Sequence, residues 1–585
     1  MIALFSSAVG AAELLDAQAL VDTAVTSGAK SITIPAGICR VEPPGHGRWA
    51  HLNLKNLTNF TIKANGVTML CTKKASAIEM SGCSNVTVRG LTIDYDPMIF
   101  TQGTVTEWAA DNSWFEVKLD AGYPQTPETK YARMDVYDAK TLRLKPDCWT
   151  MEAKEEHPLV IVEPGRVRVP WQQKHTHNNV EPGDLIAICE GGPHCIVING
   201  CSHCTLRDVT TYGAGCFGVI EDKGDANRYD NFRIIPGPKP AGASRARIRS
   251  TCADGFHSNG AHIGPTLEHC RIESTGDDAI AIHGKYFEVL KGSGRELVIA
   301  GKPHVGDRVR VVSDKVEVRG EAVITNVVRI TDEKQEAELS AAWPHEHAHR
   351  PPHFDEMSVI QVDSDVSPAT GDRVSFPEHC GSGFAIRDTT VFNNRARGML
   401  IKAGNGIIED NTIDGSVICG IILCPEFYWN EACYSRDVII RNNTVRNTGL
   451  GPANGGSLQC GAIAVVADSN DGKIPAAGGH RNIRIERNTI EGCPGPCIEV
   501  TSAEHVEIIG NRMNKTHCVF RKNGERFHID TEAAIWLDND TDVTLAKNKV
   551  SGMGPFGKKF CVVTDRVTDL KGADSDKIEK QAGGK

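Results

Sequence analysis

The stretch Ile483-Arg-Ile-Glu-Arg-Asn-Thr-Ile490 is followed 23 residues later by a second version of the same pattern, Val506-Glu-Ile-Ile-Gly-Asn-Arg-Met513. In both versions apolar and polar residues alternate, an asparagine follows, and another apolar residue closes the pattern. The alternation predicts a short strand with one buried face. Asparagine favours a tight turn, because it tolerates the left-handed backbone conformation. Further versions occupy residues 407–413, 438–445 and 543–550.

A strand and turn that recur at coils of roughly 20 to 25 residues are typical of a solenoid. We therefore predict an all-β fold, a right-handed parallel β-helix, in which the recurrent asparagines stack as a ladder. Residues 13–28 carry apolar side chains at helical spacing and end at Gly28, which predicts a helix that caps the N-terminal end of the solenoid. Strand patterns begin at Ser31.

The composition supports many short strands and limits the choice of partner. The chain has 585 residues, 57 glycines, only 6% aromatic residues and a formal net charge of −10. A chain of this length would imply several compact domains unless it is a repeat protein that grows in one dimension. The negative charge argues against nucleic acid and against an anionic membrane surface as partners, so it favours a neutral substrate. A monomer and a homodimer are both compatible with the sequence.

The N-terminus and the cysteines bear on where the protein is found. Residues 1–12 are an apolar run that ends in small residues, as a secretory signal does, although the basic segment is missing; they would also suit a first buried strand. We expect a secreted or periplasmic protein. No other segment approaches the length of a membrane span. Six of the twenty cysteines fall on inward-facing strand positions, where a thiol packs like an apolar residue: Cys195, Cys204, Cys216, Cys270, Cys419 and Cys424.

Two segments lack the coil pattern and are richer in charge and proline. Both contain short strands that predict small antiparallel β-barrels inserted at coil turns. The second leaves the solenoid just after His283, so we expect it to overhang the residues described next. The predicted organisation is the N-terminal cap and first coils in 1–97, the first inserted β-barrel in 98–187, coils in 188–285, the second inserted β-barrel in 286–379, and the remaining coils and tail in 380–585.

Three carboxylates are predicted to share one patch of the solenoid. Asp254 precedes Asp277 by 23 residues, about one coil, and Asp278 is the next residue. Adjacent strand residues face opposite ways, so Asp277 and Asp278 can act together only if they lie in the turn after Gly276. Glycoside hydrolysis requires one carboxyl as an acid and a second as a nucleophile or base. Crowding raises the pKa of at least one of the three carboxyl groups, which makes it a usable acid.

Other side chains are candidates for substrate binding around these aspartates. His257 and His283 lie beside them in the sequence, and continuing the register places Arg397 one coil after Asp278. Arg397 could hold a carboxylate or sugar hydroxyls, or it could be an exposed surface arginine. Glu426 and Trp429 belong to an aromatic loop that could stack on a sugar or pack on itself. The aspartates are predicted to act without metal or cofactor, although an Asp turn ladder or a structural cation site would use the same residues.

The segment Asp254-Gly-Phe-His257, followed one coil later by Gly276-Asp-Asp-Ala-Ile-Ala-Ile-His-Gly284, resembles glycoside hydrolase family 110. This resemblance implies a β-helix with two inserted barrels that removes terminal α-1,3-linked galactose from glycans, including blood group B structures, with inversion. It implies that Asp254, Asp277 and Asp278 are the catalytic residues. The resemblance is specific mainly over residues 252–284.

Three alternatives remain. The family 28 polygalacturonases also have Asp-Gly-Phe one coil before Asp-Asp, but they expect a Gly-His-Gly and an Arg-Ile-Lys farther along, and residues 397–402 are too widely spaced for the second motif. A polysaccharide lyase or uronate epimerase on a β-helix would use the carboxylates to hold calcium. A carbohydrate-binding solenoid without catalytic activity would need only the polar and aromatic surface.

Overall fold

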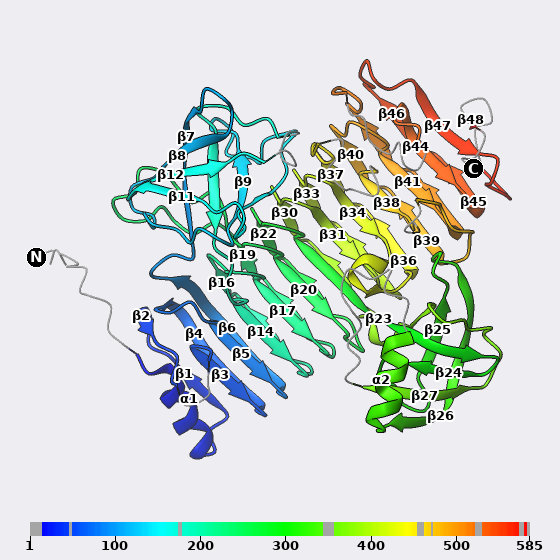
Figure 1. Ribbon diagram of the computed structural model, residues 1–585, viewed down its shortest axis with the longest axis horizontal. Helices are drawn as coiled ribbons and strands as arrows, with labels where there is room; N and C mark the ends of the chain where they lie inside the picture. Colours follow the sequence, from blue (N-terminus) through cyan, green and yellow to red (C-terminus); the bar gives the residue numbers. More distant parts are fainter. Residues whose placement is uncertain are drawn as a thin grey trace, which may run out of the picture.

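The computed structural model describes residues 15–45, 49–172, 178–342, 356–452, 461–467, 469, 472–520, 529–572 and 578–581. The chain winds into a parallel β-helix, and an inserted domain projects from it at two places (Figure 1). The predicted β-helix fold is therefore confirmed. Three columns of parallel strands run along the helix, and most coils add a strand to each column.

The first column carries the residues of the candidate site. It consists of β3 (Leu52–Lys55), β5 (Ile78–Ser81), β14 (Ile196–Asn199), β17 (Val219–Asp222), β20 (Phe256–Asn259), β23 (Ile280–Ser293), β31 (Arg397–Ile401), β34 (Cys419–Leu423), β38 (Ile463–Val465), β41 (Ile498–Thr501), β44 (Ala533–Asp538), β47 (Lys559–Thr564) and β48 (Ile578–Gln581).

The other two columns belong to one continuous sheet and share the long strands β4 (Thr58–Cys71) and β6 (Ser84–Tyr95). The second column also contains β1 (Ser31–Thr33), β15 (Thr205–Arg207), β18 (Arg228–Asp230), β21 (Thr266–Glu268), β29 (Ala385–Arg387), β32 (Gly406–Glu409), β36 (Arg436–Arg441), β39 (His480–Glu486), β42 (Ala503–Ile509) and β45 (Thr541–Ala546). The third contains β2 (Gly37–Val41), β16 (Thr210–Thr211), β19 (Arg233–Ile234), β22 (Arg271–Glu273), β30 (Thr390–Phe392), β33 (Thr412–Asp414), β37 (Thr444–Arg446), β40 (Thr489–Glu491), β43 (Arg512–Asn514) and β46 (Lys549–Ser551).

The predicted asparagine ladder is confirmed. At Asn488, Oδ1 accepts hydrogen bonds from the backbone N (2.9 Å) and Nδ2 (3.0 Å) of Asn443, while Nδ2 donates to Ile440 O (2.9 Å) and to Asn511 Oδ1 (3.0 Å). The buried ladder consists of Asn411, Asn443, Asn488, Asn511 and Asn548.

The left-handed conformation occurs one residue earlier than we predicted. The residues with positive φ are those that immediately precede the ladder asparagines: Asp410, Asn442, Arg487, Gly510 and Lys547. The preceding residue turns the backbone, so the asparagine side chain is free to enter the interior and bond the next coil.

The N-terminal helix α1 (Ala17–Thr26) caps the first coil, as predicted. The Asp16 side chain accepts a hydrogen bond from Ala19 N (2.8 Å) at the start of the helix, and the apolar face of the helix is buried. Gln18 Nε2 donates to Asn53 O (3.1 Å), which ties the helix to β3. Within the described residues, no helix is long and apolar enough to cross a membrane.

The first insertion is an antiparallel sheet in the order β10-β9-β13-β7-β8-β12-β11. Its strands are β7 (Phe100–Trp108), β8 (Trp114–Leu119), β9 (Arg133–Tyr137), β10 (Met151–Glu152), β11 (Val160–Glu163), β12 (Arg166–Pro170) and β13 (Leu185–Cys189). In the part of the chain that the structure describes, β10 and β11 are the two edges, so this insertion is an open sheet and not the closed barrel that the pattern suggested.

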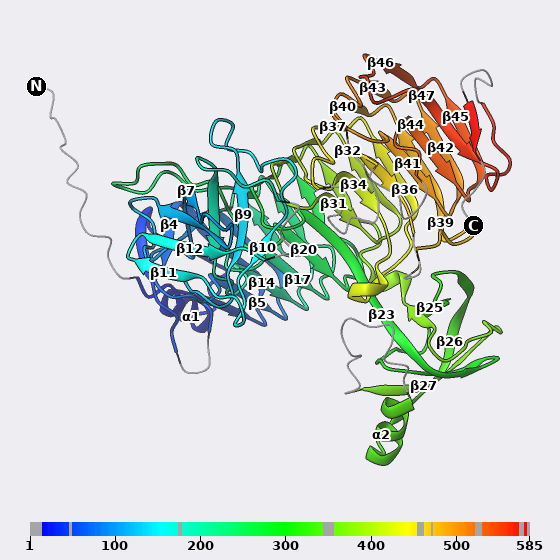
Figure 2. The same cartoon turned by 45° about the horizontal axis from the view of Figure 1, so that its top comes forward.

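The second insertion is a closed antiparallel barrel. Figure 2 shows β23 leaving the β-helix and continuing into this domain. Strand β23 pairs with β24 (Glu296–Ile299) and β28 (Arg373–Ser375), and β27 (Met357–Val362), β26 (Val318–Ile330) and β25 (Arg308–Val312) complete the circle. Helix α2 (Glu333–Ala342) follows β26, and the short helix η3 (Pro377–His379) leads back to the β-helix.

The cysteines at inward-facing positions are buried, except for Cys216, which is half-buried. A disulfide joins Cys189, the last residue of β13, to Cys252. Neither cysteine was among the predicted positions. This bond attaches the first insertion to the chain two residues before Asp254.

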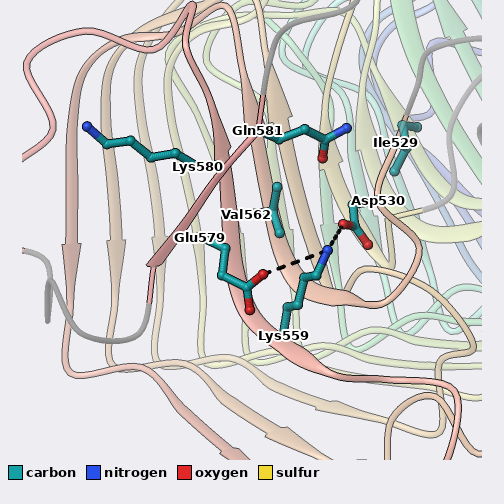
Figure 3. Close-up of a pocket in the computed structure, with 7 residues that line it drawn as sticks. All are labelled: Ile529, Asp530, Lys559, Val562, Glu579, Lys580 and Gln581. Carbon is teal, nitrogen blue, oxygen red and sulfur yellow. Dashed lines mark hydrogen bonds and ion pairs between the residues drawn. The ribbon is translucent and has the colours of Figure 1, made fainter.

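A cavity of about 330 Å³ lies at the C-terminal end of the β-helix, beside β47 and β48 (Figure 3). Its lining residues are Ile529, Asp530, Lys559, Val562, Glu579, Lys580 and Gln581. Lys559 Nζ lies 2.5 Å from Asp530 and 3.8 Å from Glu579, so its charge is compensated within the cavity wall. The cavity belongs to coils that do not contain the predicted carboxylates.

The ladder predicts a large effect of Asn488→Ala on stability. Truncation removes four buried hydrogen bonds, two from Asn443, one to Ile440 O and one to Asn511 Oδ1, at a cost of about 3 to 5 kcal/mol. Denaturant unfolding followed by circular dichroism measures the loss. Asn199→Ala on the exposed end of β14 is the control and should change stability by less than about 0.5 kcal/mol. Equal effects of the two substitutions would show that the ladder does not stabilise the coils.

Candidate active site

The register of the first column brings Asp254, Asp278 and Arg397 to the same level on neighbouring coils. Phe256 of β20 pairs with Ile280 of β23, and Ile280 pairs with Met399 of β31. The three polar residues each precede these partners by two. Backbone bonds extend the pairing to them, because Gly255 N donates to Asp278 O (2.9 Å) and Ala279 N donates to Arg397 O (2.9 Å).

Asp277 and Asp278 lie in the bend that precedes β23, as predicted, and both reach the same space. One carboxylate oxygen from each of Asp254, Asp277 and Asp278 lies within 4.8 Å of the others. Gly276 allows the bend, since a Cβ there would collide with Cys252 O and with Arg249. The nearest oxygens are therefore closer than the roughly 6.5 to 9.5 Å typical between the carboxyl groups of inverting glycosidases.

Two arginines keep Asp277 ionised. Its Oδ2 lies 2.6 Å from Arg395 Nη2 and 3.2 Å from Arg133 Nη2. Burial alone would raise the pKa of the Asp277 carboxyl, but the two guanidinium groups outweigh burial and the pKa is lowered. The Arg395 guanidinium stacks 4.4 Å from the ring of Trp149. Arg133 and Trp149 both come from the first insertion, so this domain forms part of the site.

Asp278 is the carboxyl best suited to hold a proton at neutral pH. Burial raises its pKa to about 7; Arg397 opposes this, and the neighbouring Asp254 and Asp277 add to it. Arg397 donates from its backbone N to Oδ1 (2.8 Å) and from Nη2 to Oδ2 (2.8 Å). The Arg397 side chain is only 19% exposed, which removes the alternative of a surface arginine.

Asp254 begins a row of close contacts that runs into the protein. Its Oδ2 lies 2.7 Å from His257 Nδ1, the two Nε2 atoms of His257 and His283 are 2.7 Å apart, and His283 Nδ1 lies 2.7 Å from Gly284 O. The Phe217 ring stacks on His257 with centroids 4.6 Å apart. Burial raises the pKa of Asp254, and the contact with His257 opposes this increase.

A buried lysine joins two further carboxylates to the cluster. Lys402 Nζ lies 2.7 Å from Glu426 and 2.5 Å from Glu431, and Arg397 Nη2 is 3.4 Å from Glu426. Burial acts to raise the pKa of Glu431, but the positive charges of Lys402 and His257 nearby outweigh it, and the pKa is lowered far below its usual range. Glu426 and Glu431 bracket η4 (Phe427–Trp429), and β35 (Glu431–Ala432) follows it.

The predicted site residues Asp254, Asp277, Asp278, His257, His283, Arg397 and Glu426 therefore form one connected cluster. Trp429 belongs to the aromatic loop beside it. The Trp429 side chain is 42% exposed and contacts Tyr428 edge to face, with the ring centroids 4.8 Å apart. A role of this loop in sugar stacking stays a prediction.

Sequence reasoning missed Arg133, Trp149, Arg395, Lys402 and Glu431. Arg395 and Lys402 lie two residues before and five residues after the predicted Arg397, so a search of the basic side chains around that arginine could have identified them. Arg133 and Trp149 carried no such signal, because tertiary packing of an insertion brings them to the site.

The second barrel lies beside the site and supports it indirectly, whereas we expected it to overhang the carboxylates. It is the first insertion that contacts Asp277. Arg373 of the barrel donates from Nη1 to Phe427 O (2.7 Å) and stacks over the Phe427 ring, and Gly284 pairs with Ala432. The barrel thereby holds the loop that carries Glu426 and Glu431.

Two groups of side chains converge closely enough to be considered for a metal ion: the three aspartates, and His257 with His283 and Glu431. Protein cations already contact the carboxylates in both groups, through Arg133, Arg395, Arg397 and Lys402. We assign no metal to either group.

Comparison with known proteins places these features in a family context. A model of the right-handed beta helix region matches residues 356–512. An alpha-1,3-galactosidase B of Bacteroides thetaiotaomicron is 22% identical over 552 residues, which cover 88% of this chain and 82% of the relative. An alpha-1,3-galactosidase A of Bacteroides fragilis is 21% identical over 559 residues, with coverage of 85% and 84%. The predicted resemblance to this family is confirmed.

Solved structures match this chain only weakly. A family 28 exopolygalacturonase of Yersinia enterocolitica has 10% identity and a TM-score of 0.41, covering 95% of this chain and 73% of that chain. The A-module of a mannuronan C-5 epimerase of Azotobacter vinelandii has 10% identity and a TM-score of 0.36, with coverage of 92% and 94%. Likenesses this weak carry no argument about activity.

The ion pair with Arg397 predicts how the Asp278 pKa responds to substitution. Arg397→Gln removes the guanidinium but keeps the backbone N–H, so the Asp278 pKa should rise from about 7 by about one unit or more. Infrared titration of the protonated carboxyl band, identified by its loss in Asp278→Asn, measures the pKa. Arg397→Lys keeps the charge and should shift the pKa less. An unchanged pKa in Arg397→Gln would contradict the assignment of this carboxyl.

Proposed function

We propose that this β-helix chain, a relative of the alpha-1,3-galactosidases, is a glycoside hydrolase that removes terminal α-1,3-linked galactose from glycans. Two observations support the proposal together. The similarity to enzymes of that name extends along most of the chain. The carboxylates that the resemblance implies as catalytic converge in one cluster with contrasting ionisation. Of these two observations, the convergence of the three aspartates is the one on which the proposal depends.

We assign Asp278 as the acid and Asp254 as the base. Asp278 has the pKa of about 7 that suits a proton donor near neutrality. Its proton passes to the glycosidic oxygen as the bond from that oxygen to the anomeric carbon breaks. A water molecule forms the new bond to that carbon, and Asp254 accepts the proton of the water. Asp277 stays ionised between Arg133 and Arg395 and stabilises the positive charge that develops on the sugar ring.

The balance of charge in the cluster favours a neutral sugar. Its carboxylates are Asp254, Asp277, Asp278, Glu426 and Glu431, and its cations are Arg133, Arg395, Arg397 and Lys402. Each of these arginines and the lysine already contacts a carboxylate of the cluster, so none of them is left to pair with the acid group of a uronate. This supports a galactoside over the polygalacturonate or alginate-type substrates of the alternative functions.

We propose exo action because parts of two different loops enclose the carboxylates. From the first insertion, Arg133 contacts Asp277 and Trp149 stacks on Arg395. On the other side, Glu426 of the aromatic loop contacts Arg397. A site that is enclosed on more than one side accommodates the terminal sugar of a glycan more readily than an internal one.

Inversion is the outcome we propose for the anomeric carbon. It follows the resemblance to family 110 and the assignment of Asp278 as the acid and Asp254 as the base that activates water. The short distance between the nearest carboxylate oxygens would suit retention equally well. Stereochemistry is therefore the sharpest test of the mechanism.

A screen of terminal α- and β-galactosides, with and without a fucosyl branch, tests the function. We expect release of galactose from α-1,3-galactosides only, and proton NMR during turnover should show the β-anomer first. Retention would disprove the assigned mechanism. An unsaturated product would indicate a lyase, and binding without turnover would indicate a carbohydrate-binding protein.

Substitutions of the aspartates separate catalysis from binding. Asp278→Asn and Asp254→Asn should each lower kcat by about 10³-fold or more, with calorimetric binding of the substrate retained, because the acid or the base is lost. Asp388→Asn is the matched control: its side chain is 62% exposed on a neighbouring coil, and the substitution should leave kcat unchanged. Full activity in Asp278→Asn would exclude the proposed acid.

A further inference from the structure

The row Asp254, His257, His283 and Gly284 contains three contacts of 2.7 Å, and each contact requires a hydrogen atom between its two heavy atoms. The carbonyl oxygen of Gly284 only accepts, so His283 Nδ1 must carry a hydrogen. One of the two facing Nε2 atoms must carry a second. The contact between Asp254 and His257 needs a third.

Two neutral imidazoles carry only one ring hydrogen each. An ionised Asp254 with two neutral histidines would therefore leave one of the three contacts without a hydrogen, and two lone pairs would face each other at 2.7 Å. The observed row holds together only if it carries one additional proton.

The charges around the row decide where this proton resides. His257 lies 2.7 Å from the Asp254 carboxylate, whereas the nearest carboxylate of His283 is Glu431 at 3.7 Å, which Lys402 already neutralises. Between Asp254 and His257, the imidazole is the stronger base by about 2.6 pKa units in model compounds.

We propose that His257 is a permanent imidazolium and the positioning residue that keeps Asp254 ionised as the catalytic base. His257 Nδ1–H donates to Asp254 Oδ2, and His257 Nε2–H donates to His283 Nε2. Asp254 Oδ1 is then the oxygen that takes the proton from water. This inference rests on the proposed function for its catalytic meaning, but the state of the imidazole can be measured without any substrate.

The environment of His257 agrees with this state. Burial opposes a positive charge on His257, and so does Lys402, but Asp254 and Glu431 favour it, and the pKa of His257 is raised. On the other side, Phe217 separates His257 from His194; burial lowers the pKa of His194 to about 4, so this ring adds no positive charge near neutrality. Burial likewise lowers the pKa of His283 to about 3, which keeps it neutral as the acceptor.

Nitrogen-15 NMR of the full-length protein labelled at histidine tests the proposal. His257→Gln and His283→Gln assign the two rings. At pH 7.5 we expect His257 with both ring nitrogens protonated and His283 with a hydrogen on Nδ1 only. His304, whose side chain is 78% exposed, is the internal control for an imidazole outside the cluster. A neutral His257 in the unmodified protein would overturn the proposal.

Asp254→Asn provides the second arm. An asparagine amide can donate to His257 Nδ1, so all three contacts then need only the two hydrogens of neutral imidazoles. We expect His257 to become neutral in this variant, and a His257 that stays protonated would overturn the proposal. Treatment of the unmodified protein with EDTA should leave the spectrum unchanged, because a changed spectrum would place a metal ion where we place the proton.

A kinetic arm links the imidazolium to Asp254. His257→Gln removes the cation beside Asp254, so the acidic limb of kcat/KM against pH should move up by about one to two pH units. A role of His257 in packing alone would lower kcat without moving this limb, and that result would overturn the positioning role. If no galactoside is hydrolysed at all, the proposed function fails, and NMR still decides the protonation of His257.

Discussion

Backbone hydrogen bonds between successive coils set the positions of the groups at the centre of the site, Asp254, Asp278 and Arg397. Parallel pairing of β20, β23 and β31 puts Asp254, Asp278 and Arg397 at one level, although residues 286–379 separate the second from the third in the chain. Neighbouring strands lie about 4.8 Å apart. Side chains at one level therefore meet at the distance that shared protons and ion pairs require, and a shift of one residue in any coil would turn the group to the other face.

The site contains many buried charges, and both insertions help to provide the partners that compensate them. The first supplies Arg133 to Asp277, and the second holds the loop whose Glu426 and Glu431 surround Lys402. Burying a charge is costly unless a partner compensates it. The insertions are thus part of the electrostatic structure of the cluster as well as its walls.

The repeat and the aspartates were accessible to sequence reasoning because both depend on local pattern. Alternation and the recurrent asparagine predicted the coils, and the coil length placed Asp254 beside Asp278. The turn itself was displaced by one residue, since the pattern does not distinguish the residue that bends the chain from the one that bonds the next coil. Arg133, Trp149 and the link from Cys189 to Cys252 depend on how an insertion docks, and no spacing in the chain encodes that docking.

The asparagine ladder runs from Asn411 to Asn548, on the C-terminal side of the coils that hold the carboxylates. In a solenoid each coil is stabilised by its immediate neighbours, so local opening starts at a free end and advances inward. The ladder adds side-chain hydrogen bonds to the steps of such an advance between Asn548 and Asn411. The coils of Asp254 and Asp278 have further coils on both sides and are consequently protected from fraying. Their geometry persists while the terminal coils open locally.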